Sequence, residues 1–196
     1  MGVELYFDVG SPYSFLAVER AERVLGEAPR LRPVLLGGLF KLAGRASWGV
    51  GDPALREAGM LEVESRAMAY DLPAIRWPKP WPGDYLAAMR VAVWADAQGA
   101  CAAYAFAAGR RAFLRGCDLS LDSEIAAAAE EAGLDGGAAL VAARDPAVKL
   151  ALREATEAAF ARGVLGVPTV AVGDRLLWGD DRLEAAAMPP QPAATV

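Results

Sequence analysis

Residues 7–16 read FDVGSPYSFL, and this stretch decides how the chain is expected to fold. Residues 3–9 alternate apolar and polar side chains as a strand does, and an apolar stripe at helical spacing continues beyond the break to Leu25. Ser11 suits a helix N-cap, and Pro12 suits the first helical turn because its missing N–H would be unpaired there anyway. Free amides and the helix dipole at that end favour an anion. We therefore predict an anion-binding strand, turn and helix with the Ser11 hydroxyl at its tip.

The turn Ser11-Pro12-Tyr13-Ser14 resembles the Cys-x-x-Cys redox turn of the DsbA-like thioredoxin proteins, with both cysteines replaced by serine. The same replacement is found in kappa-class glutathione transferases and in 2-hydroxychromene-2-carboxylate isomerases, whose sequences open in a similar way. The resemblance implies an α/β, thioredoxin-like fold with a large all-helical insertion. It also implies that Ser11 is catalytic and binds reduced glutathione, by donating a hydrogen bond that holds the sulfur as a thiolate. By position alone, a plain helix cap is the commoner role for such a serine.

The composition is that of a well-packed globular protein. The chain has 196 residues, of which 55% are apolar, so it is long enough to bury a full core. With 20 Lys and Arg against 25 Asp and Glu the net charge is −5, so the surface does not attract phosphate backbones and nucleic acid is not an expected partner. No basic segment followed by an apolar one opens the chain, and no apolar run reaches membrane-spanning length. We expect a cytoplasmic protein that does not contact a membrane.

The chain has no histidine and only two cysteines, Cys101 and Cys117, which are far apart. The lack of histidine excludes Ser-His-Asp triads, Cys-His nucleophiles and histidine-ligated metals. The cysteines lack the spacing of a zinc site, so no metal is expected and both thiols are predicted to be buried or inert. Any catalysis must therefore use hydroxyls, carboxylates, cations, backbone amides or a group borrowed from a small molecule.

The pattern of strands predicts a sheet interrupted by a long helical segment. Residues 31–36 form a second strand in which Pro33 suits an edge or a strand start, and the helix before it implies a parallel pair. Residues 37–41, GGLFK, are expected to turn the chain out of the sheet. Helical patterns without a convincing strand then run from about residue 42 to residue 162.

Local signals mark several element boundaries in the rest of the chain. Asp122 is expected to cap one helix, and Asp145-Pro146 to supply the cap and first turn of the last long one. Residues 168–178 form a hairpin that turns at Gly173-Asp174, and a short helix follows at residues 182–187. We therefore predict a discontinuous thioredoxin-like domain of residues 1–41 and 163–188, an inserted helical domain of residues 42–162, and a frayed tail at residues 189–196.

The motif Gly166-Val167-Pro168-Thr169 is the second candidate part of the site. General frequencies favour an ordinary trans proline at the head of a strand. The resemblance implies instead the cis proline that thioredoxin-like folds carry beside the redox turn. The N–H and C=O of Val167 would then pair with the cysteinyl part of glutathione as a short added strand. Val167 and Pro168 are accordingly expected to bind the cofactor.

The segment Gly179-Asp180-Asp181-Arg182 is the third candidate part. An aspartate at a helix start is normally a cap. In kappa-type proteins, however, a similar Gly-x-Asp-Arg segment holds the γ-glutamyl end of glutathione, whose ammonium group binds a carboxylate. Asp181 matches the shared aspartate, and Asp180 stands in the variable position before it. The resemblance thus places both among the cofactor-binding residues.

Arg45 departs from the family pattern. Relatives often have an asparagine there, followed by prolines that this chain lacks, and residues 47–60 also fit the family poorly. An arginine at this place would bind a carboxylate of glutathione or of the substrate. The alternative is a solvated loop charge.

Residues 76–82, RWPKPWP, predict a stiff aromatic loop. Its indoles, Trp77 and Trp81, are either part of a rigid linker that covers the core or the wall of a substrate site, and the two interpretations are equally favoured. Two indoles beside cations suit a flat aromatic carboxylate as substrate. Phe40 and Trp48 are expected to complete that pocket.

These expectations converge on a glutathione-dependent cis-trans isomerase similar to 2-hydroxychromene-2-carboxylate isomerase. It would act on that compound or a related aromatic hydroxy acid by reversible thiolate addition. A kappa-like glutathione transferase or peroxidase would use the same site and is the nearest alternative. An inactive thioredoxin-fold binding module is the alternative from another class, and the departure at Arg45 is its best support. The resemblance also implies a homodimer.

Overall fold

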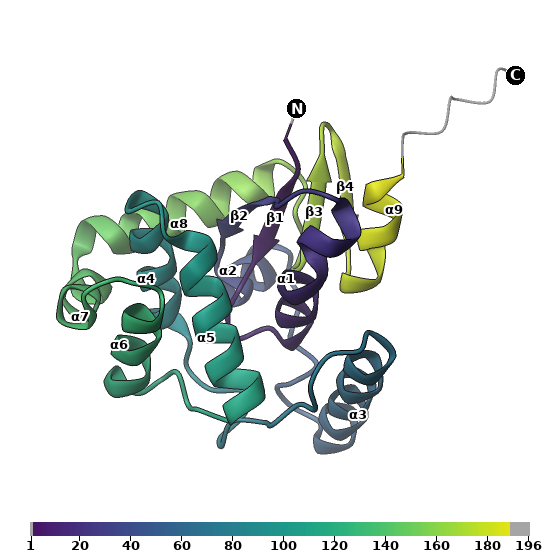
Figure 1. Ribbon diagram of the computed structural model, residues 1–196, viewed down its shortest axis with the longest axis horizontal. Helices are drawn as coiled ribbons and strands as arrows, with labels where there is room; N and C mark the ends of the chain where they lie inside the picture. The colour runs from purple at the N-terminus through teal and green to yellow at the C-terminus, as the bar shows by residue number, and fades with distance from the viewer. Residues whose placement is uncertain (1, 189–196) are drawn as a thin grey trace, which may run out of the picture.

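The structure, a computed structural model, describes residues 2–188. It contains a four-stranded sheet with the strand order β2-β1-β3-β4 (Figure 1). The strands are β1 (Glu4–Phe7), β2 (Arg30–Pro33), β3 (Thr169–Val172) and β4 (Arg175–Trp178). β1 pairs with β2 in parallel and with β3 in antiparallel orientation, and β3 and β4 form a hairpin. The predicted parallel pair, the hairpin and the edge position of Pro33 are confirmed.

Helix α1 (Pro12–Leu25) connects the parallel strands and begins at the predicted turn. Ser11 is its N-cap, the Ser11 side chain accepts a hydrogen bond from the Ser14 amide, and Pro12 opens the first turn, as predicted. The helix ends at Gly26, whose φ of +76° lies in the left-handed region that glycine adopts without steric cost. The end of β1 and the N-terminus of α1 therefore meet at Ser11.

The chain between β2 and β3 is mostly helical, and no strand occurs in this described segment. It contains α2 (Leu36–Leu42), α3 (Pro53–Ala69), α4 (Leu86–Ala97), α5 (Cys101–Arg115), α6 (Asp122–Glu131), α7 (Gly136–Arg144) and α8 (Pro146–Ala161). After β4 come a 3-10 turn, η1 (Asp180–Arg182), and α9 (Leu183–Ala187). The division of the chain into two domains at residues 42 and 162 stays a prediction.

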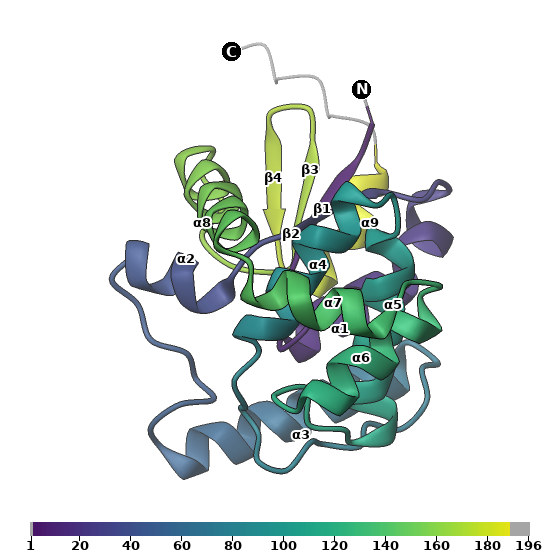
Figure 2. The same cartoon turned by 90° about the vertical axis from the view of Figure 1, so that its left-hand side faces the viewer.

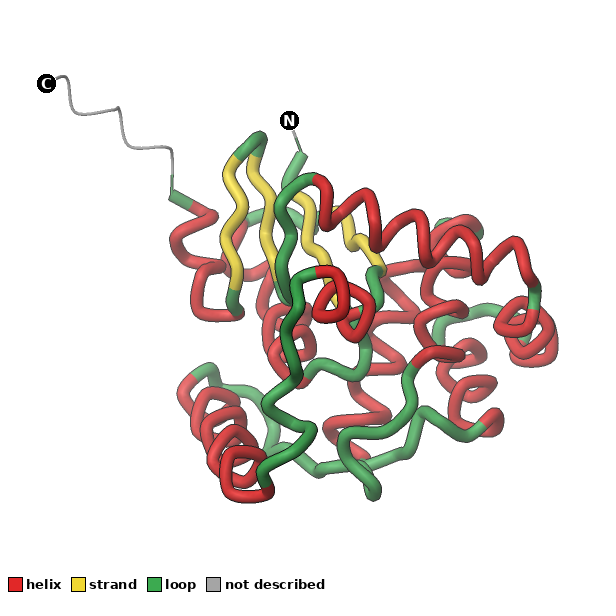
Figure 3. The backbone as a smooth tube through the Cα atoms, turned by 180° about the vertical axis from the view of Figure 1, so that it is seen from behind, coloured by secondary structure: helices red, strands yellow, loops and turns green. Residues whose placement is uncertain are grey.

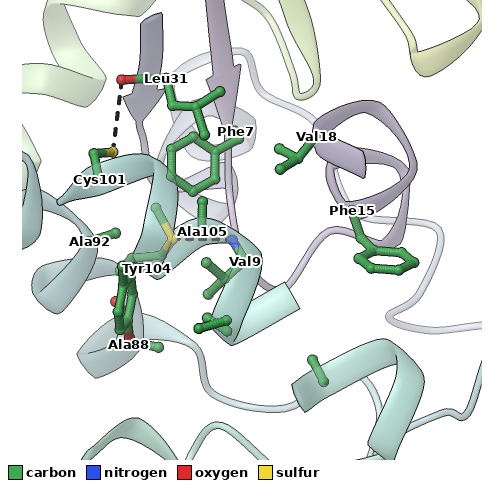
Figure 4. Close-up of a cluster of buried hydrophobic side chains, with 14 of the residues drawn as sticks. Phe7, Val9, Phe15, Val18, Leu31, Ala88, Ala92, Cys101, Tyr104 and Ala105 are labelled. Carbon is green, nitrogen blue, oxygen red and sulfur yellow. Dashed lines mark hydrogen bonds between the residues drawn. The ribbon is translucent and has the colours of Figure 1, made fainter. Parts of the chain in front are cut away.

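Strand β1 divides the interior between two hydrophobic clusters, because successive side chains of a strand point to opposite faces. Leu5 and Phe7 enter the larger cluster with residues of α1, α4 and α5, among them the fully buried Tyr104 (Figure 4). Tyr6 enters the smaller cluster, where it joins Leu39 of α2 and residues of α8. The sheet thus packs against α1 on one face and against α2 and α8 on the other (Figure 2).

Helix α3 stands somewhat apart from the other helices and lies below α1 in Figure 1. The connections on both sides of it, residues 43–52 and 70–85, contain neither helix nor strand and form the long loops seen from behind in Figure 3. α3 contacts α1. Its position therefore depends on a few specific contacts, which are described with the site.

Residues 37–41 were expected to turn the chain out of the sheet, and they do so as part of α2, a helix that was not predicted. Two tertiary contacts hold the helix in spite of its glycines. The Leu36 amide donates a hydrogen bond to Asp8 Oδ2 at 2.8 Å. Gly38 packs so closely on Thr156 of α8 that a Cβ there would come within 3.1 Å of Thr156 Cγ2. Tertiary contacts thus override a weak local helix propensity.

The expectation that Asp122 caps its helix is wrong. Leu121 is the N-cap of α6, and Asp122 is the first helical residue, with a carboxylate that pairs with Arg144. Asp145 and Pro146 begin α8 as predicted. The predicted frayed tail at residues 189–196 lies outside the described residues.

Candidate active site

A pocket of about 540 Å³ opens where β1 ends and α1 begins. Some of its lining comes from elements beside the sheet and the rest from the helical segment and its loops. We call these the sheet wall and the helical wall. The sheet wall consists of the lining residues within 8–13, 167–168 and 178–181, and the helical wall of those within 35–50 and 81–86, together with Arg66.

Ser11 lies on the sheet wall and is 3% exposed. Its Oγ accepts a hydrogen bond from the Ser14 amide at 3.2 Å, and its hydroxyl proton has no acceptor among residues 2–188. The Tyr13 amide in the same turn also has no hydrogen-bond partner in this part of the chain. Ser14 Oγ accepts a hydrogen bond from the Asp8 amide at 3.3 Å and so has a local structural role. The N-terminus of α1 thus offers two donors to an anion.

Asp8 links the Ser11 turn to the helical wall. It is buried, and its carboxylate accepts hydrogen bonds from the Gly10 and Leu36 amides, each at 2.8 Å. Burial raises the pKa of Asp8 to about 6, and the two hydrogen bonds act in the opposite direction. The carboxylate therefore fixes the start of α2 beside the start of α1.

Val167 and Pro168 line the same pocket as Ser11 and belong to the sheet wall. The peptide bond between them is cis, as the resemblance implied. The Pro168 carbonyl accepts a hydrogen bond from the Gly179 amide at 2.9 Å. The N–H and C=O of Val167 make no hydrogen bond with another described residue. This backbone edge is therefore open to an extended ligand.

Asp180 and Asp181 are neighbours in different environments. Asp180 is 1% exposed, and its carboxylate accepts from Arg66 Nη1 at 2.7 Å and from the Tyr70 hydroxyl at 3.0 Å. Burial raises the pKa of Asp180, and the Arg66 guanidinium acts against that shift. Asp181 is exposed, lines the pocket and has no ion pair within residues 2–188. Asp180 therefore attaches α3 to the sheet wall, whereas the Asp181 carboxylate is available to a ligand.

The structure brings Phe40, Trp48 and Trp81 together on the helical wall, but Trp77 is not part of the lining. Trp81 packs against Trp48 and Trp77, with ring centroids 5.1 and 4.6 Å apart. Trp77 in turn packs edge-on against Phe113 at 5.9 Å. Trp77 therefore belongs to the rigid support behind Trp81.

Arg45 also lies outside the lining of the pocket. Its side chain is exposed, and its guanidinium lies 5.4 Å from the ring centroid of Trp178, which does line the pocket. The structure thus places Arg45 near the pocket rim.

Arg66 and Tyr85 line the pocket without having been predicted from the sequence. Arg66 comes from α3, whose place depends on a bond to a carboxylate 114 residues later in the chain. Tyr85 is the N-cap residue of α4 but makes no side-chain cap hydrogen bond. The helical pattern that begins near Tyr85 is the one local signal, and it does not indicate which way the side chain points.

Other candidate chemistry is sparse in the described chain. Residues 2–188 contain no group of three or more His, Cys, Asp or Glu side chains that could hold a metal ion. Cys101 is buried, and burial raises the pKa of its thiol to about 12. None of the described helices is long and apolar enough to cross a membrane.

Comparison with known proteins places the fold among thioredoxin-like structures. Residues 2–188 match the family described as the DSBA-like thioredoxin domain. A solved 2-hydroxychromene-2-carboxylate isomerase superposes with a TM-score of 0.80 at 26% identity, over 93% of this chain and 91% of that one. A probable DsbA oxidoreductase from Streptomyces coelicolor gives a TM-score of 0.71 at 21% identity, over 99% of this chain and 93% of that one, and supports the fold alone. The predicted fold class is confirmed.

Two enzymes are similar over nearly the whole sequence. The 2-hydroxychromene-2-carboxylate isomerase of Sphingobium xenophagum is 31% identical over 192 residues, which cover 93% of this chain and 94% of that protein. Human glutathione S-transferase kappa 1 is 32% identical, over 94% of this chain and 88% of that protein.

Proposed function

The chain belongs to the DSBA-like thioredoxin family, and from this premise we propose that it is a glutathione-dependent cis-trans isomerase. Its substrate is 2-hydroxychromene-2-carboxylate or a related aromatic hydroxy acid. The observation that carries the proposal is the Ser11 hydroxyl, which has no described acceptor and lies at the N-terminus of α1 on the wall of a pocket. A hydroxyl at this position can donate a hydrogen bond to a bound anion.

The sheet wall fits the parts of glutathione in order. Ser11 lies where the sulfur would be bound, and the open backbone edge of Val167 suits the cysteinyl unit as a short added strand. The exposed carboxylate of Asp181 suits the γ-glutamyl ammonium group. Arg45, which lies near the pocket rim against Trp178, is proposed to bind the glycine carboxylate.

Ser11 and the N-terminus of α1 favour the ionised form of a bound thiol. A free thiol has a pKa of about 8.5, and a helix N-terminus together with a hydrogen-bond donor lowers it. The Ser11 proton is available for this purpose because its Oγ meets the Ser14 amide as an acceptor. Ser11 therefore holds the sulfur as a thiolate at neutral pH.

Bound glutathione would supply a thiolate nucleophile for reversible addition to the conjugated double bond of the substrate, which allows rotation about that bond. The chain's own contribution is position. Phe40, Trp48 and Trp81 hold a flat aromatic ring beside Ser11 and keep water away from it. These residues do not hold the part of the substrate that carries the double bond, so that part stays free to rotate.

A kappa-like transferase is the second candidate, favoured by the 32% identity to human glutathione S-transferase kappa 1. It would use the same sulfur site on an electrophile that stays attached to glutathione. Turnover of a chromene carboxylate and of a generic electrophile such as 1-chloro-2,4-dinitrobenzene separates the two functions. Faster conjugation of the generic electrophile would overturn the isomerase proposal.

Calorimetric titration tests the cofactor directly. The purified protein is titrated with reduced glutathione and with the analogue in which serine replaces the cysteine. We expect glutathione to bind and the analogue to bind more weakly, because it offers no thiolate to Ser11. Equal affinities, or no binding of either compound, would contradict the proposal.

A further inference from the structure

Two buried donors on the helical wall, the Tyr85 hydroxyl and the Trp81 indole N–H, have no hydrogen-bond partner within residues 2–188. Both residues line the pocket, and Tyr85 is 9% exposed. Leaving a buried polar group unpaired costs free energy, so nearly all such groups in native proteins are paired. Two unpaired donors at one pocket wall therefore indicate an acceptor that a ligand brings.

Packing holds both donors in place. The Tyr85 ring lies against Gly10, where an added Cβ would be 2.3 Å from Tyr85 Cδ2, so only glycine allows this approach. Gly10 immediately precedes Ser11, and the ring is therefore fixed beside the proposed sulfur site. Trp81 is held by stacking against two further indoles, at 5.1 and 4.6 Å between centroids. Because these contacts restrict rotation, the donors are organised before a ligand arrives.

The Tyr85 hydroxyl is a neutral donor. Burial raises the pKa of Tyr85 far above its ordinary value, and the carboxylates of Asp118 and Asp8 raise it further. The Gly83 amide approaches the phenol oxygen as a donor without completing a hydrogen bond. The hydroxyl proton therefore still lacks an acceptor.

The charges around the pocket select the kind of acceptor. Four aspartates line it, and the lining arginine, Arg66, is already paired with Asp180. A neutral phenol among carboxylates favours a carbonyl oxygen over a fully charged carboxylate group. Negative charge that develops on such an oxygen during a reaction would then strengthen the hydrogen bond.

On the basis of the proposed function, we propose that the Tyr85 hydroxyl, assisted by the Trp81 N–H, binds the carbonyl oxygen of the substrate. In such a substrate, a carbon-carbon double bond is conjugated to that carbonyl. When the carbon-sulfur bond forms, the displaced π-electron pair moves onto this oxygen, and it returns when the bond breaks. No proton is transferred and no oxidant or reductant is consumed. Tyr85 is thus a catalytic residue, and the substrates are conjugated ketones and 2-oxo acids rather than peroxides or alkyl halides.

Tyr85→Phe removes the donor, and Tyr104→Phe is the matched control. Tyr104 is fully buried, but its hydroxyl is paired with the Ala88 carbonyl at 3.2 Å, away from the pocket (Figure 4). The probe is the glutathione-dependent isomerisation of cis-4-phenyl-3-buten-2-one to its trans form. We expect Tyr85→Phe to lower kcat roughly 100-fold, as for loss of an oxyanion-binding donor. Tyr104→Phe should leave kcat for the enone at the wild-type value.

Two further measurements do not depend on turnover. The infrared carbonyl stretch of bound trans-4-phenyl-3-buten-2-one should move to lower frequency in the wild type and return towards its solution value in Tyr85→Phe. Thermal melts should show Tyr85→Phe to be as stable as the wild type or more so, because it loses an unpaired buried hydroxyl. Tyr104→Phe should melt at a lower temperature because it loses a hydrogen bond.

The outcomes separate this inference from the proposed function. Failure of the wild type to bind glutathione would remove both. Glutathione binding with no turnover of the enone, or with equal enone kinetics in Tyr85→Phe, would overturn the role of Tyr85 alone. Destabilisation of Tyr85→Phe to the same degree as Tyr104→Phe would mean that its hydroxyl is paired within the protein, which also contradicts the inference.

Discussion

The two walls of the pocket are built in different ways. The sheet wall presents a hydroxyl, a helix N-terminus and an open backbone edge, all within short local motifs. The helical wall presents indoles, a phenol and a guanidinium carried by loops and helices that are distant in sequence. The difference suggests two separate tasks. The sheet wall holds a thiol through a hydroxyl and backbone groups, and the helical wall recognises the electrophile through side chains.

Several contacts join the walls, among them the following three. Asp8 accepts the Leu36 amide, Gly10 lies under the Tyr85 ring, and Asp180 binds Arg66. Each places a group of the helical wall against the sheet wall. Variants on either side of these contacts therefore test whether the tasks are separable.

Ser11→Ala should have the largest effect. Removal of the donor to the sulfur should lower kcat by roughly 100-fold, or about 3 kcal/mol, and should raise the glutathione Kd by a smaller factor. Ser14→Ala is the matched control, since its hydroxyl accepts only the Asp8 amide. Steady-state kinetics give kcat and glutathione titrations give Kd for both variants. Unchanged kcat in Ser11→Ala would end the assignment of catalysis to the sheet wall.

Asp180→Asn should act on stability. The substitution removes the charge that holds Arg66 and leaves that guanidinium with Glu62 alone, at 2.6 Å on the same helix. Because Asp180 is buried and Arg66 is partly exposed, we expect a loss of about 2 kcal/mol in the free energy of unfolding. Urea denaturation measures the loss. Wild-type stability in this variant would show that α3 is held by other contacts.

Asp8→Asn should change how stability depends on pH. The pKa of Asp8 is raised to about 6 in the folded protein, so between pH 4 and 6 the folded state binds more protons than the unfolded state. This contribution is fully present below the unfolded pKa and is lost as pH rises through about 6. The wild type should therefore gain about 2 kcal/mol from this group between pH 7 and 4.5.

In Asp8→Asn that gain should vanish, although the variant is less stable at every pH because asparagine has one oxygen to accept two amides. The difference between the two pH profiles isolates Asp8 from other carboxyl groups, such as Glu124, whose pKa is lowered by Arg111. Parallel profiles would mean that Asp8 titrates normally.

Asp181→Asn should have the smallest effect and complete the comparison with Asp180. An exposed carboxylate that binds an ammonium group contributes about 1 kcal/mol, so the glutathione Kd should rise roughly fivefold while stability stays constant. Calorimetry and a thermal melt give both values. An unaltered Kd would remove Asp181 from the site.

The sheet wall could be predicted because its signals are local. An alternating run and a serine followed by proline lie within a few residues of the groups they place, and β1, α1 and the β3–β4 hairpin were found where expected. The cis Val167–Pro168 bond was implied by the family resemblance of the Gly-Val-Pro-Thr motif. The helical wall could not be predicted in the same way. Arg66 reaches the pocket through a contact 114 residues away, and Tyr85 through the absence of a side chain at Gly10. Neither contact can be recognised from the sequence around Arg66 or Tyr85.

The local signals failed where tertiary packing decided the outcome. A helix at residues 37–41 was not predicted, because the Asp8 carboxylate and the close approach to α8 make these residues helical in spite of their glycines. Trp77 and Trp81 are alike in sequence, yet one lies behind the other and only Trp81 lines the pocket. Which of two similar residues faces a ligand depends on the path of the loop that carries them.

The most direct test of the central claim is the pKa of the glutathione thiol in the complex, followed by the ultraviolet absorbance of the thiolate as a function of pH. In the wild type we predict a pKa well below the value of about 8.5 for a free thiol, with a return towards that value in Ser11→Ala. A bound thiol that titrates like a free one in the wild type, or identically in both proteins, would contradict the assignment of Ser11 as the group that holds the thiolate.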